Sequence, residues 1–183
     1  MEFEAFPKMA RLSRKMIVTE KIDGTNAQVC ISEDCEIRAG SRTRWITPED
    51  DNFGFAAWVR DNRNGLLALG PGRHFGEWWG KGIQRGYGLT ERRFSLFNAT
   101  RWTDDVRPAC CHVVPILWRG EFDTAAVSAI IESMREQGSA AAPGFTSPEG
   151  VIVFHTGSNS AWKKTLEKDE LPKTLAQRIA YAA

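Results

Sequence analysis

Lys21 is the residue of this chain whose type and setting most favour nucleophilic chemistry. It directly follows the short, apolar and β-branched run at residues 16–20 and precedes the turn-forming pair Asp23-Gly24. A strand that ends in a tight turn fixes the stem of a lysine and leaves its amine facing a cleft. An amine attacks phosphorus only in its neutral form, which requires cations or a metal ion nearby. Taken alone, Lys-Ile-Asp-Gly favours a plain surface hairpin.

Two carboxylates and a pair of lysines follow Lys21 in separate segments. Glu77 stands between aromatic residues and glycines at 74–80, and Glu149 precedes the apolar run 151–154. Lys163 and Lys164 fall inside a further strand-like segment. Carboxylates bind Mg²⁺ directly or through water, and cations neutralise phosphate charge in a transition state. Each residue has an ordinary structural explanation, but together with Lys21 they indicate attack on a nucleoside triphosphate.

The segments that carry these residues resemble motifs I, III, IV and V of the covalent nucleotidyltransferases. This superfamily comprises DNA ligases, RNA ligases and mRNA-capping guanylyltransferases, and the nearest resemblance is to RNA ligases of the phage RNA ligase 2 type. Residues 75–77, 82–84 and 94–97 are similar to the motif III and IIIa region of that group, and Gly-Ile-Gln at 82–84 is the more specific part. Residues 165–170 resemble the end of such ligase domains.

The resemblance implies ATP as the nucleotide donor, Mg²⁺ or Mn²⁺ as the metal, and Lys21 as the residue that takes AMP. It also implies contacts with the nucleotide, its phosphates or the metal for Glu20 (adenine amino group), Ile22, Asn26 and Arg42 (phosphate or terminal nucleotide), Glu77 (ribose or metal), Phe97 (stacking on adenine), Glu149 (metal) and Lys163 (α-phosphate). The family has Lys-x-Lys in motif V, whereas adjacent lysines leave opposite faces of a strand. Only one of the two can then face the α-phosphate, and from the resemblance our first candidate is Lys163, with Lys164 as the alternative.

The elements between these motifs predict an α+β fold of antiparallel sheets flanked by helices. Apolar runs predict strands at residues 16–20, 27–31, 36–39, 74–79, 94–98, 111–118, 151–154 and 162–166. We expect the first three to form an antiparallel meander with Lys21 at the edge of a turn. The resemblance implies a ligase-type nucleotidyltransferase fold, similar to ATP-grasp, and we expect residues 1–183 to form a single nucleotidyltransferase (adenylation) domain.

Two helices are predicted with some detail. Apolar residues at helical spacing between 127 and 134 predict a helix from about Thr124 to a C-terminal stop at Gly138. Asp50-Asp51 is expected to cap a shorter helix through residues 53–59. Residues 65–73 predict a loop punctuated by glycine and proline, and a short helix is expected from about Pro172.

The charge balance restricts how the chain can contact nucleic acid. The formal net charge is only +1, from 24 Lys and Arg against 23 Asp and Glu, so any contact requires local clusters rather than a basic whole-body field. Candidate clusters are Arg11, Arg14 and Lys15; Arg38, Arg42 and Arg44; and Lys81, Arg85, Arg92 and Arg93. The four cysteines fit no metal-binding pair and predict free thiols in a reducing cytosol. Without a signal peptide or apolar span, we expect a cytoplasmic monomer.

Three functions remain open at this point. The first is an ATP-dependent RNA ligase that joins 5′-phosphate to 3′-OH ends in RNA or in nicked duplexes that contain RNA. The second is a minimal DNA ligase or a nucleotidyltransferase with another acceptor, and the third is a catalytically silent nucleic-acid-binding domain. Only residues 165–183 follow motif V. The expected lack of an oligonucleotide-binding domain argues against a typical DNA ligase or capping enzyme, and it leaves open weak activity, an accessory partner or a restricted substrate range.

Overall fold

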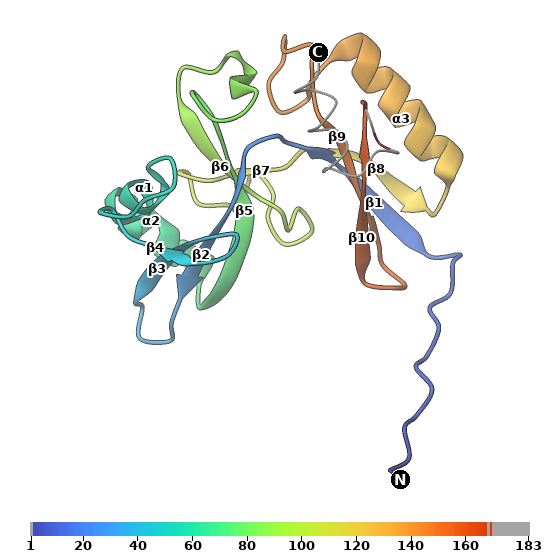
Figure 1. Cartoon of the computed structure of the whole chain (residues 1–183), viewed down its shortest axis with the longest axis horizontal. Coiled ribbons are helices and arrows are strands. Elements are labelled where there is room, and N and C mark those ends of the chain that lie inside the picture. The colour runs from blue at the N-terminus through green and yellow to red at the C-terminus, as the bar shows by residue number, and fades with distance from the viewer. Residues whose placement is uncertain (1, 168, 170–183) are drawn as a thin grey trace, which may run out of the picture.

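Two β-sheets form the framework of the protein in the computed structural model, which describes residues 2–167 and 169 (Figure 1). The four-stranded sheet has the order β10-β9-β1-β8 and comprises β1 (Lys15–Lys21), β8 (Ile116–Glu121), β9 (Gly150–His155) and β10 (Ser160–Thr165). The six-stranded sheet has the order β4-β3-β2-β5-β6-β7 and comprises β2 (Thr25–Ile31), β3 (Ile37–Ser41), β4 (Trp45–Ile46), β5 (Gly72–Gly80), β6 (Arg92–Leu96) and β7 (His112–Val113). The strand pairs are antiparallel except β6 with β7, which confirms the expected α+β fold class.

Strands β1 and β2 lie in different sheets, so the expected meander over residues 16–39 is wrong. Only β2 and β3 form a hairpin, whereas β1 pairs with β8 and β9. The reason lies in the connection after Lys21. The backbone N–H groups of Asp23 and Gly24 donate to the side chains of Tyr87 and Glu77 instead of closing a hairpin. Residues 22–24 therefore carry the chain from one sheet to the other.

The expected strand at residues 111–118 is also divided between the two sheets. β7 ends at Val113 and β8 begins at Ile116, with Val114 and Pro115 between them. Proline has no N–H to donate to a strand ladder, so an uninterrupted strand through this position is unfavourable. The carbonyl oxygen of Pro115 accepts instead from the N–H of Glu20 in β1. A second crossing between the sheets thus lies beside the end of β1.

Helix α3 (Thr124–Gln137) has the bounds that the sequence predicted, and it covers one face of the four-stranded sheet (Figure 1). The Asp123 carboxylate caps its first turn by accepting from Ala125 N, and Gly138 ends it with φ 82°. Its buried side chains pack with those of β1 and β9 in a cluster of Val127, Ile131, Met134, Met16, Val18, Val151 and Val153. This packing leaves the opposite face of the sheet open.

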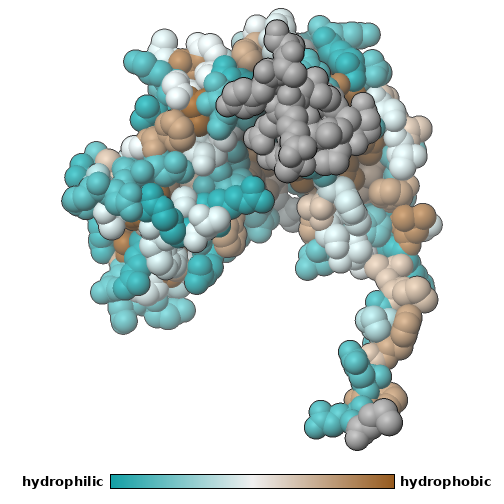
Figure 2. Space-filling model, in the orientation of Figure 1, coloured by the Kyte–Doolittle hydropathy of each residue, from teal (hydrophilic) through white to brown (hydrophobic). Residues whose placement is uncertain are grey.

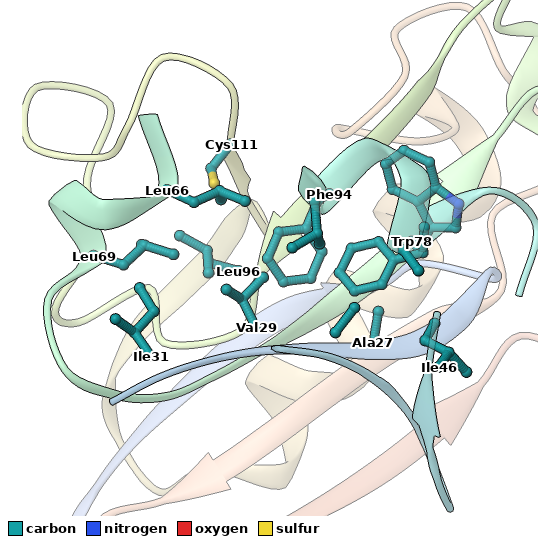
Figure 3. Close-up of a cluster of buried hydrophobic side chains, with 14 of the residues drawn as sticks. Ala27, Val29, Ile31, Ile46, Leu66, Leu69, Trp78, Phe94, Leu96 and Cys111 are labelled. Atoms are coloured by element: carbon teal, nitrogen blue, oxygen red, sulfur yellow. The ribbon is translucent and has the colours of Figure 1, made fainter. Parts of the chain in front are cut away.

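Short helices cover one face of the six-stranded sheet. They are α1 (Phe55–Asp61), α2 (Arg63–Leu66) and the 3-10 turn η1 (Leu67–Leu69); a further 3-10 turn, η2 (Gly86–Gly88), precedes β6. The loop expected at 65–73 is therefore partly helical. Helix α1 begins later than the expected 53–59 helix, and its N-cap residue is Gly54 rather than Asp50 or Asp51; the Asp51 carboxylate accepts from Ala56 N and Ala57 N in its first turn. Figure 3 shows the core beneath them, which includes Ala27, Val29, Trp78, Phe94, Leu96, Leu66 and Leu69.

The faces of the two sheets that these helices leave uncovered line a common cleft of about 1170 Å³. Lining side chains include Ile17, Thr19, Ile152, Ala161 and Lys163 from the four-stranded sheet and Asn26, Phe75 and Glu77 from the six-stranded sheet. The space-filling view shows the molecule hollowed between the two sheets (Figure 2). In the described part of the chain, no helix has the length and apolar character needed to cross a membrane. The helix expected from Pro172 lies outside the described residues.

Candidate active site

Lys21 is the last residue of β1 and lies at the junction of the two sheets, beside the cleft. Its Nζ donates a hydrogen bond to Glu149 Oε2 at 2.5 Å. The pair forms because β1 and β9 are antiparallel neighbours in which Lys21 lies opposite Gly150, the residue after Glu149. The side chains of Lys21 and Glu149 are 22% and 17% exposed, so both are accessible from the cleft and only partly hydrated.

Glu77 lies on β5 and fixes the crossing that follows Lys21. Its two carboxylate oxygens accept from Gly24 N at 3.1 Å and from Asn26 Nδ2 at 2.9 Å. Burial raises the pKa of Glu77 from 4.5 to about 7, although the bonds from Asn26 and Gly24 and the charge of Lys21 oppose this. Gly24 is required here, because a Cβ would lie 2.5 Å from the Trp78 carbonyl oxygen. The carboxyl group of Glu77 therefore holds the residues beside the lysine in place.

The two adjacent lysines of β10 point to opposite sides of the four-stranded sheet. Lys163, opposite Ile152 of β9, lines the cleft together with Ala161. Lys164 lies next to it in the strand, and its Nζ is 3.9 Å from Asp169 Oδ2. The structure therefore places Lys163 in the cleft and Lys164 outside it. The predicted contact between Lys163 and the α-phosphate stays a prediction.

Glu20 is almost fully buried and engages the loop that follows α3. Its Oε1 accepts from Ser139 Oγ at 2.6 Å, and its Oε2 accepts from Ala141 N at 2.8 Å. Burial raises the pKa of Glu20, while these hydrogen bonds oppose the rise. The carboxylate that we predicted to accept from the adenine amino group thus already has a donor on each oxygen. Its role toward a base stays a prediction, and Ser139 is a partner that the sequence did not reveal.

The other predicted nucleotide contacts, Asn26, Arg42 and Phe97, also line the cleft. Phe97 follows β6, and its side chain is 42% exposed, which suits a stacking surface. Ile22 is buried and packs in a core cluster with Trp79 and Tyr87, so its side chain anchors the crossing between the sheets. All the predicted site residues except Lys164 therefore lie along one cleft.

Several residues that line or support the cleft were missed from the sequence. Arg85 forms an ion pair with Asp23 at 3.0 Å, and the Tyr87 hydroxyl accepts from Asp23 N at 2.8 Å. Arg73 and Phe75 line the cleft on the same strand as Glu77. The period-two alternation of positions 73, 75 and 77 was a signal that placed them on one face of a strand. The sequence suggested Arg85 only as part of a basic cluster, without its ion pair to Asp23, and no local signal pointed to Tyr87.

The carboxylates of Glu77 and Glu149 fit a divalent metal in part. Both lie close enough to Lys21 to interact with its charge or bond to it, and carboxylate oxygens are the ligands that Mg²⁺ and Mn²⁺ prefer. Among residues 2–167 and 169, no group of three or more His, Cys, Asp or Glu side chains has the arrangement of a metal site. A metal here would therefore need phosphate oxygens and water to complete its coordination.

Comparison with known proteins assigns the fold and the family. A family profile described as RNA ligase matches residues 14–169. Solved structures with the same fold include RNA ligases from Naegleria gruberi. A mutant with AMP and Mn has a TM-score of 0.61 at 21% identity over 87% of this chain and 53% of that chain. A mutant with ATP and Mn has a TM-score of 0.59 at 21% identity over 86% and 52%.

The chain thus has the ligase-type nucleotidyltransferase fold that the sequence motifs predicted. Because the profile covers most of its length, the chain belongs to the RNA ligase family. It spans about half the length of the Naegleria gruberi ligases that share its fold. No curated protein matches it.

Proposed function

We propose that this chain is an ATP-dependent RNA ligase that carries AMP on Lys21 and joins a 5′-phosphate to a 3′-OH. One observation carries the proposal. Lys21 lines a cleft together with an ion-paired carboxylate, Glu149, a buried carboxyl group, Glu77, and a second lysine, Lys163, from β10 of the same sheet. A nucleophile, a proton acceptor and a cation around one cavity are what transfer of a nucleotidyl group requires.

The first step would use the amine of Lys21 on the α-phosphorus of ATP. A P–N bond forms while the P–O bond to pyrophosphate breaks, and the departing electrons leave with pyrophosphate. Glu149 is placed to take the proton that Lys21 must lose, since its Oε2 is 2.5 Å from Nζ. Lys163 would offset the negative charge at the α-phosphate. Bound Mg²⁺ or Mn²⁺ would neutralise phosphate charge, and neighbours solved with ATP or AMP and Mn support this choice.

The later steps would pass the AMP to RNA. The 5′-phosphate of a strand attacks the lysyl-linked phosphorus, so the P–N bond breaks and a 5′-5′ pyrophosphate forms. A 3′-OH then attacks the adenylylated 5′-phosphate, which creates the phosphodiester and releases AMP. Asn26 and Arg42 line the cleft near Lys21 and are our candidates for contacts with the terminal nucleotide in these steps. A nick held by a complementary strand would suit them best, because base pairing already positions both ends.

We further propose that residues 1–183 act as the adenylation domain of this reaction, working as a monomer in the cytoplasm. The Naegleria gruberi ligases with the same fold are about twice as long. We propose an accessory protein as a partner that supplies further contacts with RNA.

The test is labelling with α-³²P-ATP and Mg²⁺. We expect label to stay on the denatured protein, to resist base and to be released by acid, as a phosphoramidate should. Lys21→Ala should carry no label, while Lys15→Ala, at the exposed start of the same strand, should label like the parent. Equal labelling of Lys21→Ala and the parent would contradict the proposal. Labelling without sealing of any RNA or DNA nick would favour a nucleotidyltransferase with another acceptor, and no labelling would favour a silent binding domain.

A further inference from the structure

The cleft face of the six-stranded sheet is ordered in rows that run away from Lys21. Directly opposed residues of antiparallel strands have side chains on the same face. The row nearest Lys21 contains Asn26 opposite Glu77, the next has Gln28 opposite Phe75, and the third has Cys30 opposite Arg73. At about 3.3 Å per residue, Arg73 lies about 13 Å along β5 from Glu77. The cleft therefore continues well beyond the nucleotidyl-transfer site.

The far end of the cleft carries two arginines, Arg73 and Arg101, that both line it. Neither forms an ion pair with a carboxylate among the described residues, in contrast to Arg44, Arg85 and Arg107. Their positive charges are therefore not neutralised by the described part of the protein. A pair of unneutralised cations in a cleft attracts an anionic ligand.

Neutral partners hold both guanidinium groups in place. Arg73 Nη1 donates to Gln28 Oε1 at 3.2 Å, and Arg73 lies over the Trp45 ring at 5.4 Å. Arg101 Nη2 donates to the Leu69 carbonyl oxygen at 3.0 Å, and Arg101 lies over the Trp102 ring at 4.6 Å. These contacts restrict the side chains without cancelling their charge, so less entropy is lost when they bind a phosphate.

Two exposed aromatic side chains lie between the arginines and the Lys21 site. Phe75 is 52% exposed and Phe97 is 42% exposed; both line the cleft, and they are adjacent because Phe97 N donates to the Phe75 carbonyl oxygen. Exposed aromatic faces next to cations match a single strand, whose bases stack while its phosphates bind arginine. The order along the cleft is thus nucleophile, stacking surface and phosphate-binding cations.

We propose that Arg73 and Arg101 form a phosphate-binding subsite for the RNA strand, with Phe75 as its stacking surface. The subsite rests on the proposed function for the identity of the strand, and it assigns RNA contacts to residues outside the nucleotidyl-transfer centre. It also explains how a chain with a net charge of +1 can bind RNA, because the positive charges of the two arginines lie along the path proposed for the RNA strand.

The experiment compares the double variant Arg73→Gln/Arg101→Gln with the control Arg60→Gln/Arg135→Gln. The control removes the same charge from exposed arginines of α1 and α3 that pair with Asp61 and Glu132. Anisotropy of a fluorescent, 5′-phosphorylated single-stranded RNA gives affinity over a KCl series. Labelling of Lys21 by ATP gives the KM for ATP. Thermal melting and the two single variants show whether a loss reflects the site or the fold.

We expect the double variant to lose about tenfold or more in RNA affinity at low salt. The slope of the logarithm of its binding constant against the logarithm of KCl concentration should become shallower by about 1.4, the value for two lost phosphate contacts on a single strand. The KM for ATP and the labelling of Lys21 should not change, and the control should match the parent. RNA affinity equal to that of the control would overturn the subsite, as would a raised KM for ATP, which would assign the arginines to the triphosphate. Normal labelling with unchanged RNA affinity refutes the subsite alone. If the parent protein is not labelled by ATP, while the double variant binds RNA more weakly than the parent, the subsite is supported and the proposed ligase is refuted.

Discussion

Lys21 at the end of β1 and Glu149 just before β9 are 128 residues apart in the chain, yet their side chains meet at 2.5 Å. The contact depends on the antiparallel pairing of β1 with β9. In the proposed reaction the amine of Lys21 must lose a proton, and the contact places the Glu149 carboxylate beside that amine, which makes Glu149 the first residue to test.

Glu149→Gln should keep the fold and lose nucleotide transfer. The amide has almost the same shape but cannot take the proton of Lys21 or offer a metal a charged oxygen, so labelling of Lys21 should fall by at least about 100-fold. The side chain is partly exposed, so the melting temperature should stay close to that of the parent. Glu36→Gln, on an exposed turn, is the control. A variant that unfolds would restore a structural role for Glu149.

Glu77 should make stability depend on pH. The folded state holds a proton with a pKa of about 7, whereas an ordinary Glu releases it at 4.5. The unfolded state therefore binds fewer protons in this window, and stability falls as pH rises through it, by up to about 3 kcal/mol. Glu77→Gln removes the titrating group, so its free energy of unfolding relative to the parent should increase from pH 5 to pH 8.

Urea unfolding of Glu77→Gln and the parent at pH 5, 6, 7 and 8 measures this difference. A constant offset between the two proteins is also expected, because the amide has only one oxygen for the donors Gly24 N and Asn26 Nδ2. A difference that does not vary with pH would show that Glu77 is ionised throughout the range.

The two lysines of β10 should have unequal effects. Lys163→Met removes a cation that lines the cleft and should slow labelling of Lys21 by about 100-fold or more, as loss of a charge-stabilising group does. Lys164→Met is the matched control, because its side chain leaves the other face of the sheet and lies near Asp169. Single-turnover labelling at saturating ATP separates the two. A greater loss in Lys164→Met would reverse the assignment.

The nucleotide that is transferred to Lys21 should carry adenine as its base. A site built around an acceptor for the adenine amino group rejects guanine, which offers an oxygen there, so ATP should label Lys21 at least about 100-fold faster than GTP. Glu20→Gln should narrow this ratio if the Glu20 carboxylate reads the base. Ser139→Ala, which removes a donor but keeps the carboxylate, should leave it unchanged. Equal labelling by GTP would contradict the roles of both Glu20 and Phe97.

The 3′ end of the sealed nick should be a ribonucleotide. Nicks with pre-adenylylated 5′ ends bypass the first step, so sealing at a ribose or deoxyribose 3′ terminus can be compared directly. We expect faster sealing at ribose, with Arg42→Ala and Asn26→Ala slowing sealing more than labelling of Lys21. Preference for deoxyribose would support the DNA-ligase alternative.

The sequence by itself determined the local features of this protein. Lys21 after an apolar strand, the helix from about Thr124 to Gly138, and the strand that contains Glu77 depend on residues a few positions apart, and each was predicted without a structure. The motif order likewise placed the chain in a family that its profile match confirms.

Only the tertiary structure decided which segments meet. In the structure, β2 lies in a different sheet from β1, and Lys163 lines the cleft whereas Lys164 does not. The Glu20 carboxylate accepts a hydrogen bond from Ser139. A strand's alternation shows which of its faces is apolar but does not identify the strand that will cover or pair with it. That choice depends on the burial of apolar faces contributed by segments more than 100 residues apart, and local sequence carries no information about it.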